Sequence, residues 1–399
     1  MRTVYTMFQR LLQTTLLAQS KQFPVMTLLG PRQSGKTTLV KALYPHKTYI
    51  NLEEPDTRAF IASDPRQLFS TYPQGLILDE IQRLPELLSN IQVLVDENNQ
   101  MGQFILTGSH QVALSEAISQ SLAGRTGLLE LLPLSMQEMK NNQLPLDLDA
   151  LLIKGGYPRL YDKPIDAPVY FRTYVRTYVE RDVRQIINVQ NLDQFQRFMQ
   201  LCAGRVACIL NFESLANDVG VSSPTIHAWL SVLQASYLVK LLPAYFENFG
   251  KRVIKAPKLF FTDLGLVSYL LGIETDLHMN RNPIRGHLFE NLVMLEIMKA
   301  KLNQGLDSKL YYYRDNHQNE VDLIIQQGHQ LIPIEIKSTQ TFNPVLLKNL
   351  KFYQNLVGER CPKGLLIYAG EQEQWVGNIY VMNYKNCASF FSILEAADI

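Results

Sequence analysis

The sequence predicts an α/β protein of three parts: a parallel-sheet domain, a helical segment that ends in a helix-turn-helix, and a second, smaller α/β domain. One observation behind this is a glycine-rich loop at residues 30–37, between an apolar run and a helix start. The others are a helix-turn-helix pattern at 212–239, and a helix followed by three strand-like runs between 285 and 338. The domain boundaries that follow are 1–140, 141–208, 209–280 and 281–399.

Composition places the chain among ordinary globular proteins. Its 399 residues are 46% hydrophobic and 19% charged, which suffices for several packed cores and argues against disorder. The formal net charge is +1, so contact with nucleic acid requires local basic clusters. The four cysteines include no CxxC pair, which argues against a zinc site and fits a reducing compartment. Neither a signal-peptide pattern nor an apolar run of about 20 residues is present, so we expect a cytoplasmic protein without a membrane partner.

Residues 30–37 match the G-x-x-x-x-G-K-[ST] pattern of a phosphate-binding loop at every fixed position. The glycines allow successive backbone N–H groups to curl around a phosphate at a helix N-terminus. Lys36 can bridge the outer phosphates, and the hydroxyl of Thr37 can bind Mg²⁺. The pattern predicts that ATP and Mg²⁺ bind here. The candidate nucleotide-binding residues are Gly30, Pro31, Arg32, Gln33, Ser34, Gly35, Lys36, Thr37 and Thr38.

A second strand that ends in carboxylates is expected at residues 75–82. Its apolar part, 76–78, predicts a strand buried on both faces. Asp79 then lies where it can hold the metal through water, and Glu80 lies where it can orient or deprotonate the attacking water.

Two further positions could complete this site. The apolar run 104–106 ends in polar residues, and Thr107 or Ser109 could hydrogen-bond the γ-phosphate or the water; a simple turn is the alternative. Arg125 lies on a loop before the strand-like run 128–132, where it could act as an arginine finger in a neighbouring copy. The alternative for Arg125 is a surface ion pair. A finger would require a homo-oligomer.

Four strings together carry a family resemblance: GPRQSGKTTL, LILDEIQRLP, FILTGSHQ and LAGRTGLLELLPLS. They resemble the AAA-type ATP-binding proteins of bacteria and archaea, in the same order and over essentially the whole chain. In that family an AAA-like P-loop ATPase domain is followed by a winged helix and a C-terminal domain of unknown function related to PD-(D/E)xK nucleases. The resemblance implies the same architecture and ATP hydrolysis for this chain.

The middle of the chain begins with a glycine-rich turn at 155–158. Beyond it, Tyr170, Tyr174 and Tyr178 recur every fourth residue and predict one buried stripe of a helix. Three arginines lie off that stripe, beside Glu180 and Asp182: Arg172, Arg176 and Arg184. A salt-bridged outer face and contact with phosphate are both open for these arginines.

The helix-turn-helix is predicted by apolar positions on two short helices around Gly220, with Ser222 or Ser223 as the N-cap of the second helix. A wing strand is expected at 239–245. The second helix offers Ser222, Ser223, Thr225 and His227, none of which grips a base as arginine does. DNA binding and protein binding both remain open. The better phosphate contact is a basic cluster at Lys251, Arg252, Lys255 and Lys258.

In the last third, a helix is expected over 285–301 and strands over 309–314, 319–325 and 330–338. Because side chains alternate along a strand, Glu335 and Lys337 point to one side, where Asp322 of the neighbouring strand can join them. Two carboxylates can hold a divalent metal, Glu290 can add an oxygen ligand, and the lysine can stabilise phosphate charge. The set Glu290, Asp322, Glu335 and Lys337 resembles that of the PD-(D/E)xK nucleases, with Val321 in place of the proline. The alternative is a retained fold whose carboxylates only form ion pairs.

Two functional hypotheses follow. The first is an ATP hydrolase that acts on nucleic acid, with a metal-dependent nuclease site in the C-terminal domain. The second is an ATP-dependent switch or scaffold that binds protein partners and cuts nothing. The expected catalytic residues are Lys36, Glu80, Arg125, Glu335 and Lys337, and the expected metal ligands are Thr37, Asp79, Glu290, Asp322 and Glu335.

Overall fold

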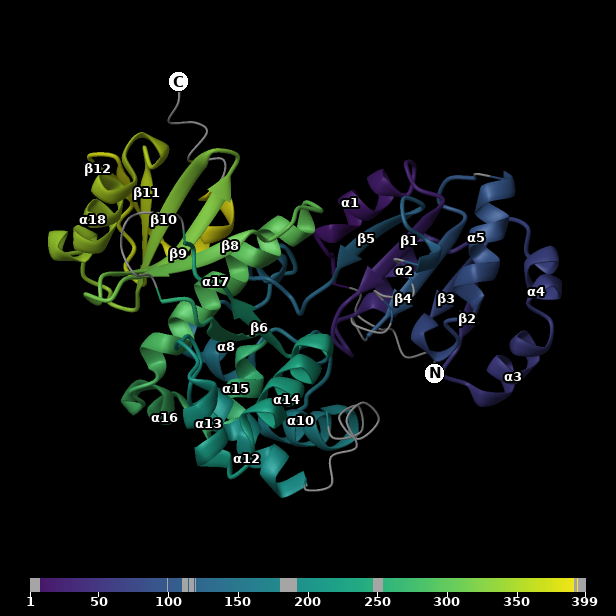
Figure 1. The fold of residues 1–399 in the computed structure, drawn as a ribbon, viewed down its shortest axis with the longest axis horizontal. Helices are drawn as coiled ribbons and strands as arrows, with labels where there is room; N and C mark the ends of the chain where they lie inside the picture. The colour runs from purple at the N-terminus through teal and green to yellow at the C-terminus, as the bar shows by residue number, and fades with distance from the viewer. Residues whose placement is uncertain are drawn as a thin grey trace.

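A computed structural model describes residues 8–98, 100–109, 120–179, 192–246 and 254–390, together with Leu114, Ile118 and Ile393. It has two sheet domains at opposite ends of the molecule and a helical part between them in sequence (Figure 1). Within these ranges no helix combines the length and apolar character that crossing a bilayer requires.

The N-terminal domain contains a five-stranded parallel sheet in the order β2-β3-β4-β1-β5. Its strands are β1 (Val25–Leu29), β2 (Thr48–Asn51), β3 (Leu76–Asp79), β4 (Phe104–Gly108) and β5 (Thr126–Glu130). Every residue of β1, β3 and β4 is buried, as expected for parallel strands with helices on both faces. Because the strands are parallel, the C-terminal ends of β1, β3 and β4 meet at one edge of the sheet.

Alternation along β1 divides its side chains between two helical layers. Met26 and Leu28 pack with residues of α1 (Leu12–Gln19) and α2 (Lys36–Leu43). Val25 and Leu29 belong to the other core, with residues of α4 (Pro65–Thr71) and α5 (Leu87–Asn98). The remaining elements of this domain are α3 (Pro55–Ser63) and the 3₁₀ turn Ile81–Arg83. The apolar run 25–29 therefore forms the predicted strand because both of its faces are covered.

The middle part is mostly helical. Its helices are α7 (Met136–Asn141), α8 (Leu148–Lys154), α9 (Arg159–Asp162), α10 (Ala167–Tyr174) with a π-helical turn at Val175–Val179, α12 (Leu192–Ala203), α13 (Phe212–Val219), α14 (Ser223–Ala235), α15 (Leu264–Leu270) and α16 (Asp276–Arg281). Tyr170 and Tyr174 are buried, which confirms the core position predicted for them. Glu180, Arg181, Asp182 and Arg184 lie outside the described residues, as does the side chain of Tyr178.

Helices α13 and α14 occupy the range predicted for the helix-turn-helix. Gly220 ends α13 with φ +83°, a conformation that glycine adopts without strain. The Ser222 side chain accepts a hydrogen bond from the N–H of Thr225 and caps α14. An antiparallel pair of strands follows, β6 (Val239–Leu242) and β7 (Lys258–Phe261).

The C-terminal domain has a mixed six-stranded sheet in the order β12-β13-β11-β10-β9-β8. Its strands are β8 (Leu310–Arg314), β9 (Glu320–Gln327), β10 (Gln330–Lys337), β11 (Gly364–Tyr368), β12 (Gln374–Val376) and β13 (Ile379–Asn383). Helix α17 (Arg285–Asn303) shares one core with this sheet, and α18 (Lys348–Val357) shares the other. The predicted helix and three strands at 285–338 therefore form, with ends that differ by one or two residues.

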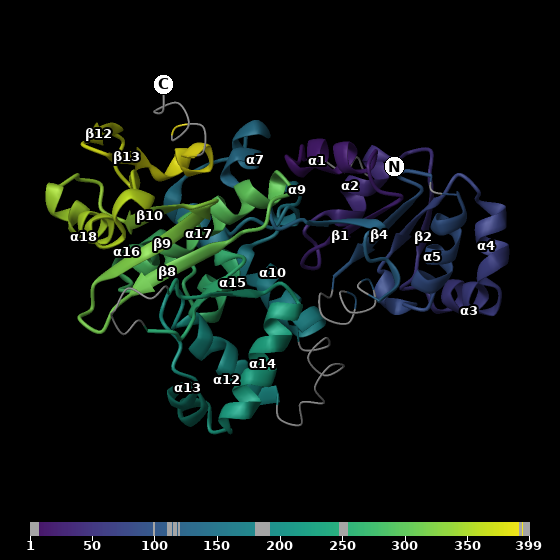
Figure 2. The same ribbon diagram turned by 45° about the horizontal axis from the view of Figure 1, so that its top comes forward.

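Helix α17 connects the two sheet domains. It runs from the C-terminal sheet toward α1 and β5 in both views of the molecule (Figures 1 and 2). Near its C-terminal end, Lys299 donates to the carbonyl of Leu134 at 3.0 Å, and Glu296 accepts from the N–H of Met136 at 2.7 Å. Both side chains are buried, so α17 is attached to the chain just after β5.

Candidate functional site

The loop between β1 and α2 depends on two glycines. Gly30 has φ +148°, and a Cβ there would lie 2.2 Å from the carbonyl oxygen of Leu131, so no other residue fits. Gly35 has φ +99° and immediately precedes α2. The loop thereby brings the free N–H groups at the N-terminus of α2 to the edge of the sheet, where they can bind an anion.

Lys36 is buried inside this loop. Its ammonium donates to the carbonyls of Gly30 at 2.8 Å and Pro31 at 2.9 Å. Burial lowers its pKa to about 8, against the opposing effect of Glu80 and Asp79. A negatively charged phosphate beside it would favour the charged form again.

Asp79 ends β3 and accepts hydrogen bonds from three hydroxyl groups. Thr37 donates to its two oxygens at 3.1 and 3.0 Å, Tyr49 donates at 2.7 Å, and Thr107 donates as well. The carboxylate is buried and its orientation is fixed. A threonine hydroxyl beside a carboxylate offers the oxygen ligands that Mg²⁺ prefers, so these residues fit that ion.

Glu80 follows directly and has the uncommon left-handed backbone conformation, with φ +59°. Its side chain accepts from Ser109 at 2.7 Å and from the amide of Gln82. Burial raises the pKa of Glu80, but the charge of Lys36 and the bond from Ser109 outweigh burial, and the pKa lies below its usual value. Glu80 is therefore an ionised carboxylate that can accept a proton or a water hydrogen bond.

The two polar residues at the C-terminal end of β4, Thr107 and Ser109, contact different acids. Thr107 contacts Asp79 and accepts from the N–H of Glu80 at 3.2 Å, whereas Ser109 contacts the Glu80 side chain. Both residues named from the sequence therefore touch the two acids. His110 lies outside the described residues.

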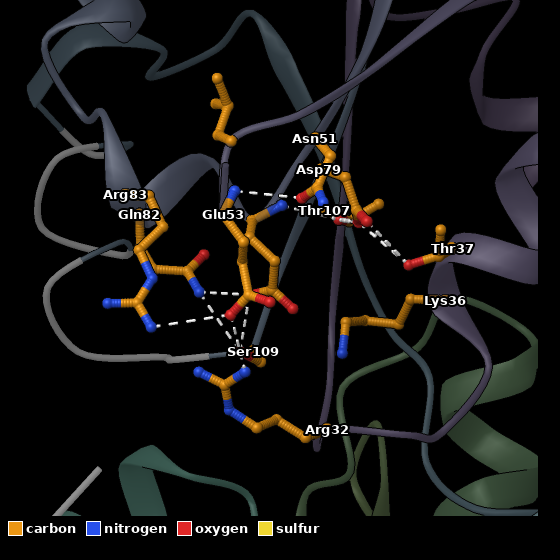
Figure 3. Close-up of polar contacts among 12 residues, drawn as sticks. Arg32, Lys36, Thr37, Asn51, Glu53, Asp79, Gln82, Arg83, Thr107 and Ser109 are labelled. Atoms are coloured by element: carbon orange, nitrogen blue, oxygen red, sulfur yellow. Dashed lines mark hydrogen bonds and ion pairs between the residues drawn. The ribbon is translucent and has the colours of Figure 1, made fainter. Parts of the chain in front are cut away.

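Arg32 adds a second cation to the loop. It pairs with Glu53 at 3.1 Å, and Arg83 approaches the same carboxylate at 3.7 Å, as Figure 3 shows. Arg32 lines the same cavity as Lys36 and Glu80, and its charge contributes to lowering the pKa of both. Glu53 and Arg83 were not foreseen, because nothing in their local sequence marks them.

A cavity of about 790 Å³ opens over the loop. One wall consists of the glycine-rich loop with Asp79 and Glu80. The other wall comes from the N-terminal segment and the middle part, and consists of Phe8, Arg10 and the residues Pro158, Arg159, Asp162, Lys163, Pro164 and Ile165. The sequence indicated a turn at 155–158 but gave no sign that the residues after it face the loop.

Arg125 lies apart from this cavity. Its guanidinium pairs with Asp96 at 2.5 and 2.9 Å on the exposed surface. Within one chain, Arg125 therefore forms the surface ion pair that the sequence left as an alternative. Its role in a neighbouring copy stays a prediction.

In the C-terminal domain, three of the four expected residues meet. Lys337 lies 2.7 Å from Glu335 and 3.3 Å from Asp322. Burial and the charge of Asp322 raise the pKa of Glu335 to about 8. Asn349 of α18 donates to Glu335 at 3.1 Å, a contact that the sequence did not indicate.

Glu290 of α17 has a different partner. Lys258, the first residue of β7, lies 2.9 Å from Glu290 and 2.5 Å from Glu320. Within the described ranges, no group of three or more histidine, cysteine, aspartate or glutamate side chains is arranged to hold a metal ion. The shared ligand set expected of Glu290, Asp322 and Glu335 is not formed here, because lysines pair with all three carboxylates.

The basic cluster predicted to contact phosphate is only partly described. Lys251 and Arg252 lie outside the described residues. Lys255 is exposed and lies over the ring of Phe246. The prediction for Lys258 is wrong in this arrangement, because its side chain is 2% exposed and enclosed by carboxylates.

The start of α14 is polar but uncharged. Ser222 and His227 are exposed, while Ser223 and Thr225 are half-buried. The His227 ring stacks on Phe212 with 4.1 Å between ring centres. No lysine or arginine lies on α14 itself.

Comparison with known proteins assigns three segments of the chain. Residues 22–140 match the model of an AAA domain, and residues 145–277 and 285–387 match two domains of unknown function, DUF8612 and DUF4143. The AAA domain match covers the five-stranded sheet, its glycine-rich loop and the two acids after β3.

Similar proteins include two from mycobacteria, uncharacterized protein Mb2031c of Mycobacterium bovis and uncharacterized protein Rv2008c of Mycobacterium tuberculosis. Each is 31% identical over 353 residues, which cover 87% of this chain and 77% of the relative. Among solved structures, the Walker-type ATPase PABY2304 of Pyrococcus abyssi has 17% identity and a TM-score of 0.40, covering 66% of this chain and 96% of its own. AMPPCP-bound DnaA from Aquifex aeolicus has 17% identity and a TM-score of 0.28, covering 56% of this chain and 86% of its own.

Proposed function

This chain belongs to the same protein family as the two mycobacterial relatives, and from that premise we propose that it is a Mg²⁺-dependent ATPase that works as a conformational switch. The AAA domain supports nucleotide binding. The observation that carries the proposal is the meeting of Lys36, Thr37, Asp79 and Glu80 at one edge of the sheet. Each of these side chains has a place in phosphoryl transfer to water.

The chemistry divides among the residues of the cavity. The N–H groups at the start of α2 and the ammonium of Lys36 hold the phosphates, with Arg32 as a second cation. Thr37 and Asp79 would hold Mg²⁺, which when bound neutralises phosphate charge. Glu80, fixed by Ser109 and Gln82, orients the water that attacks the γ-phosphate and accepts its proton.

Contacts from outside the loop support the switch. Arg10 is buried and donates to the carbonyls of Ser34 at 2.7 Å and Leu132 at 2.6 Å, and to Glu138 at 3.0 Å. Tyr170 of α10 donates to the side chain of Gln33 at 3.1 Å. A change in the loop on nucleotide binding must therefore alter contacts with the N-terminal segment, α7 and α10.

The path continues to the C-terminal domain. Residues 134–136, which follow Leu132, are bonded to Lys299 and Glu296 of α17. The same helix carries Glu290 near its other end. Because α17 is one continuous helix, it offers a route by which displacement at residues 134–136 would reach Glu290 in the C-terminal domain.

ATP turnover tests the proposal. Lys36→Ala removes the phosphate-binding ammonium and Glu80→Gln removes the proton acceptor while keeping the shape. Turnover should fall in both variants, and Glu80→Gln should still bind ATP. Unchanged turnover in both variants would refute the assignment of an ATPase.

Action on nucleic acid is a second proposal, supported by the exposed polar start of α14 and the meeting of Asp322, Glu335 and Lys337. Binding of labelled DNA should weaken steeply as salt rises if phosphates are contacted. Divalent-metal-dependent nicking of branched and linear DNA, lost in Lys337→Ala, is the test of cleavage. If neither binding nor nicking is seen, the polar start of α14 serves a protein partner instead.

A further inference from the structure

Tyr49 is a residue of β2 whose hydroxyl reaches the acid at the end of the neighbouring strand. It donates to Oδ2 of Asp79 at 2.7 Å, a distance typical of a hydroxyl bonded to a charged carboxylate. The ammonium of Lys41 in α2 lies 3.5 Å from the centre of the Tyr49 ring, a contact that helps to hold the ring. Among the described residues that line the cavity over the glycine-rich loop, Tyr49 is absent. Any effect of Tyr49 on the site must therefore pass through Asp79.

The carboxylate of Asp79 is held from both strands that flank β3. Tyr49 of β2 donates to Oδ2, and Thr107 of β4 donates to Oδ1. The hydroxyl of Thr37 shares the two oxygens (Figure 3). A carboxylate offers about four acceptor positions. The neighbouring strands therefore occupy one position on each oxygen, and the remaining two positions face Thr37, the other residue proposed to bind Mg²⁺.

This arrangement orders the acid before an ion arrives. The terminal torsion of an aspartate has a broad range of orientations when nothing holds the carboxylate. Because Asp79 is already held, ordering it costs little when the ion binds. Thr107 also accepts from the N–H of Glu80, so its removal would disturb two residues. The Tyr49 hydroxyl bonds only to Asp79 within the described part of the chain, so its removal reports on Asp79 alone.

We propose that Tyr49 is a positioning residue of the nucleotide site: its hydroxyl fixes the orientation of Asp79 and thereby strengthens binding of the Mg²⁺ that accompanies the nucleotide. The inference rests on the proposed function, because it requires that Thr37 and Asp79 hold that ion. It adds a residue from outside the cavity, on a strand that neither the glycine-rich loop nor the run before the two acids identifies.

Binding of the non-hydrolysed analogue AMPPCP tests the inference, followed by calorimetry with excess Mg²⁺ and again with EDTA. The ratio of the two dissociation constants measures how much Mg²⁺ contributes to binding. Tyr49→Phe keeps the ring and removes only the hydroxyl. We expect the ratio to fall about tenfold in Tyr49→Phe, as is typical when a partner of a metal ligand is lost, while the constant in EDTA is unchanged. Tyr44→Phe removes a hydroxyl from the same core and should leave the ratio as it is.

ATP turnover measured against Mg²⁺ concentration gives a second readout. Tyr49→Phe should need about tenfold more Mg²⁺ for half-maximal turnover, while kcat at saturating Mg²⁺ stays within about threefold. Thermal unfolding distinguishes this from a structural role. A hydroxyl that only stabilised the edge of the sheet would lower the melting temperature on removal and leave the Mg²⁺ dependence alone.

The failure of the inference and the failure of the proposed function give different results. A Tyr49→Phe protein with the same AMPPCP ratio and the same Mg²⁺ requirement as the unmodified protein would overturn the inference and leave the ATPase in place. If Mg²⁺ added nothing to AMPPCP binding by the unmodified protein, the Mg²⁺-dependent function would itself fail. The inference would then fall with it, because Tyr49 would have no metal ligand to position.

Discussion

The hydroxyl of Thr37 donates to both oxygens of Asp79, at 3.1 and 3.0 Å, although the two residues are 42 positions apart in sequence. Thr37 lies in the first turn of α2 and Asp79 is the last residue of β3. The contact forms because both lie at the same edge of the parallel sheet, with β4 between β1 and β3. It gives the loop and the acids one shared position at which Mg²⁺ can be held.

Removing this hydroxyl should disable the site without disturbing its shape. Thr37→Val replaces the hydroxyl by a methyl group, whereas Thr37→Ser keeps it. We expect Thr37→Val to lower kcat for ATP on the order of a hundredfold and to raise the Mg²⁺ concentration needed for half-maximal turnover. Thr37→Ser should stay close to the unmodified protein. Similar turnover in the two variants would show that the hydroxyl is no metal ligand.

Ser109 should set the pH dependence of turnover through Glu80. Its hydrogen bond helps to hold the pKa of Glu80 below the usual value, so Ser109→Ala should raise that pKa. Glu80 must be ionised to accept a proton, so activity is lost as pH falls through its pKa. The acidic limb of the kcat profile should therefore move to higher pH in Ser109→Ala and stay in place in Ser109→Thr. An unmoved limb in Ser109→Ala would remove Glu80 as the group seen in the profile.

The acids and the loop could be predicted from sequence because each is marked locally. Asp79 and Glu80 directly follow an apolar run. Glu335 and Lys337 are two positions apart in a strand, which places them on the same side. These local patterns were enough to predict the four residues as members of a site. Nothing in the local sequence marked Arg10, and Lys258 was marked only as a member of a basic cluster. Arg10 contacts Glu138 across 128 positions, and Lys258 reaches Glu290 from another part of the chain. Their roles come from tertiary packing, which local patterns do not encode.

Replacing Arg32 and replacing Arg125 should change ATP turnover differently as the protein concentration is varied. Arg32 lies in the cavity of its own chain, so Arg32→Ala should lower kcat at every concentration, on the order of a hundredfold. Arg125 pairs with Asp96 and does not line the cavity, so Arg125→Ala should matter only where copies assemble. Turnover measured over a dilution series distinguishes the two. Mixing Lys36→Ala with Arg125→Ala should restore activity if Arg125 serves a neighbour; no recovery would leave it a surface ion pair.

Arg10 contacts both the glycine-rich loop and α7, so it should be needed to pass a change in the loop to α7. It should also be needed for stability, because its partner Glu138 is only 1% exposed. Arg10→Met leaves a buried carboxylate unpaired, which costs about 3–5 kcal/mol in the free energy of unfolding. Replacing both partners, as Arg10→Met with Glu138→Gln, should recover much of this loss, because no charge is then left unpaired and the amide oxygen can still accept one of the N–H groups of Leu11 and Ser135. Denaturant unfolding of the three proteins measures the energies, and hydrogen exchange of the double variant with and without ATP measures whether nucleotide binding still affects α7. The double variant should bind ATP but no longer pass the change to α7, so nucleotide should no longer alter the hydrogen-exchange protection of residues 134–141. A double variant as unstable as Arg10→Met would show that packing, rather than charge, is what Arg10 provides.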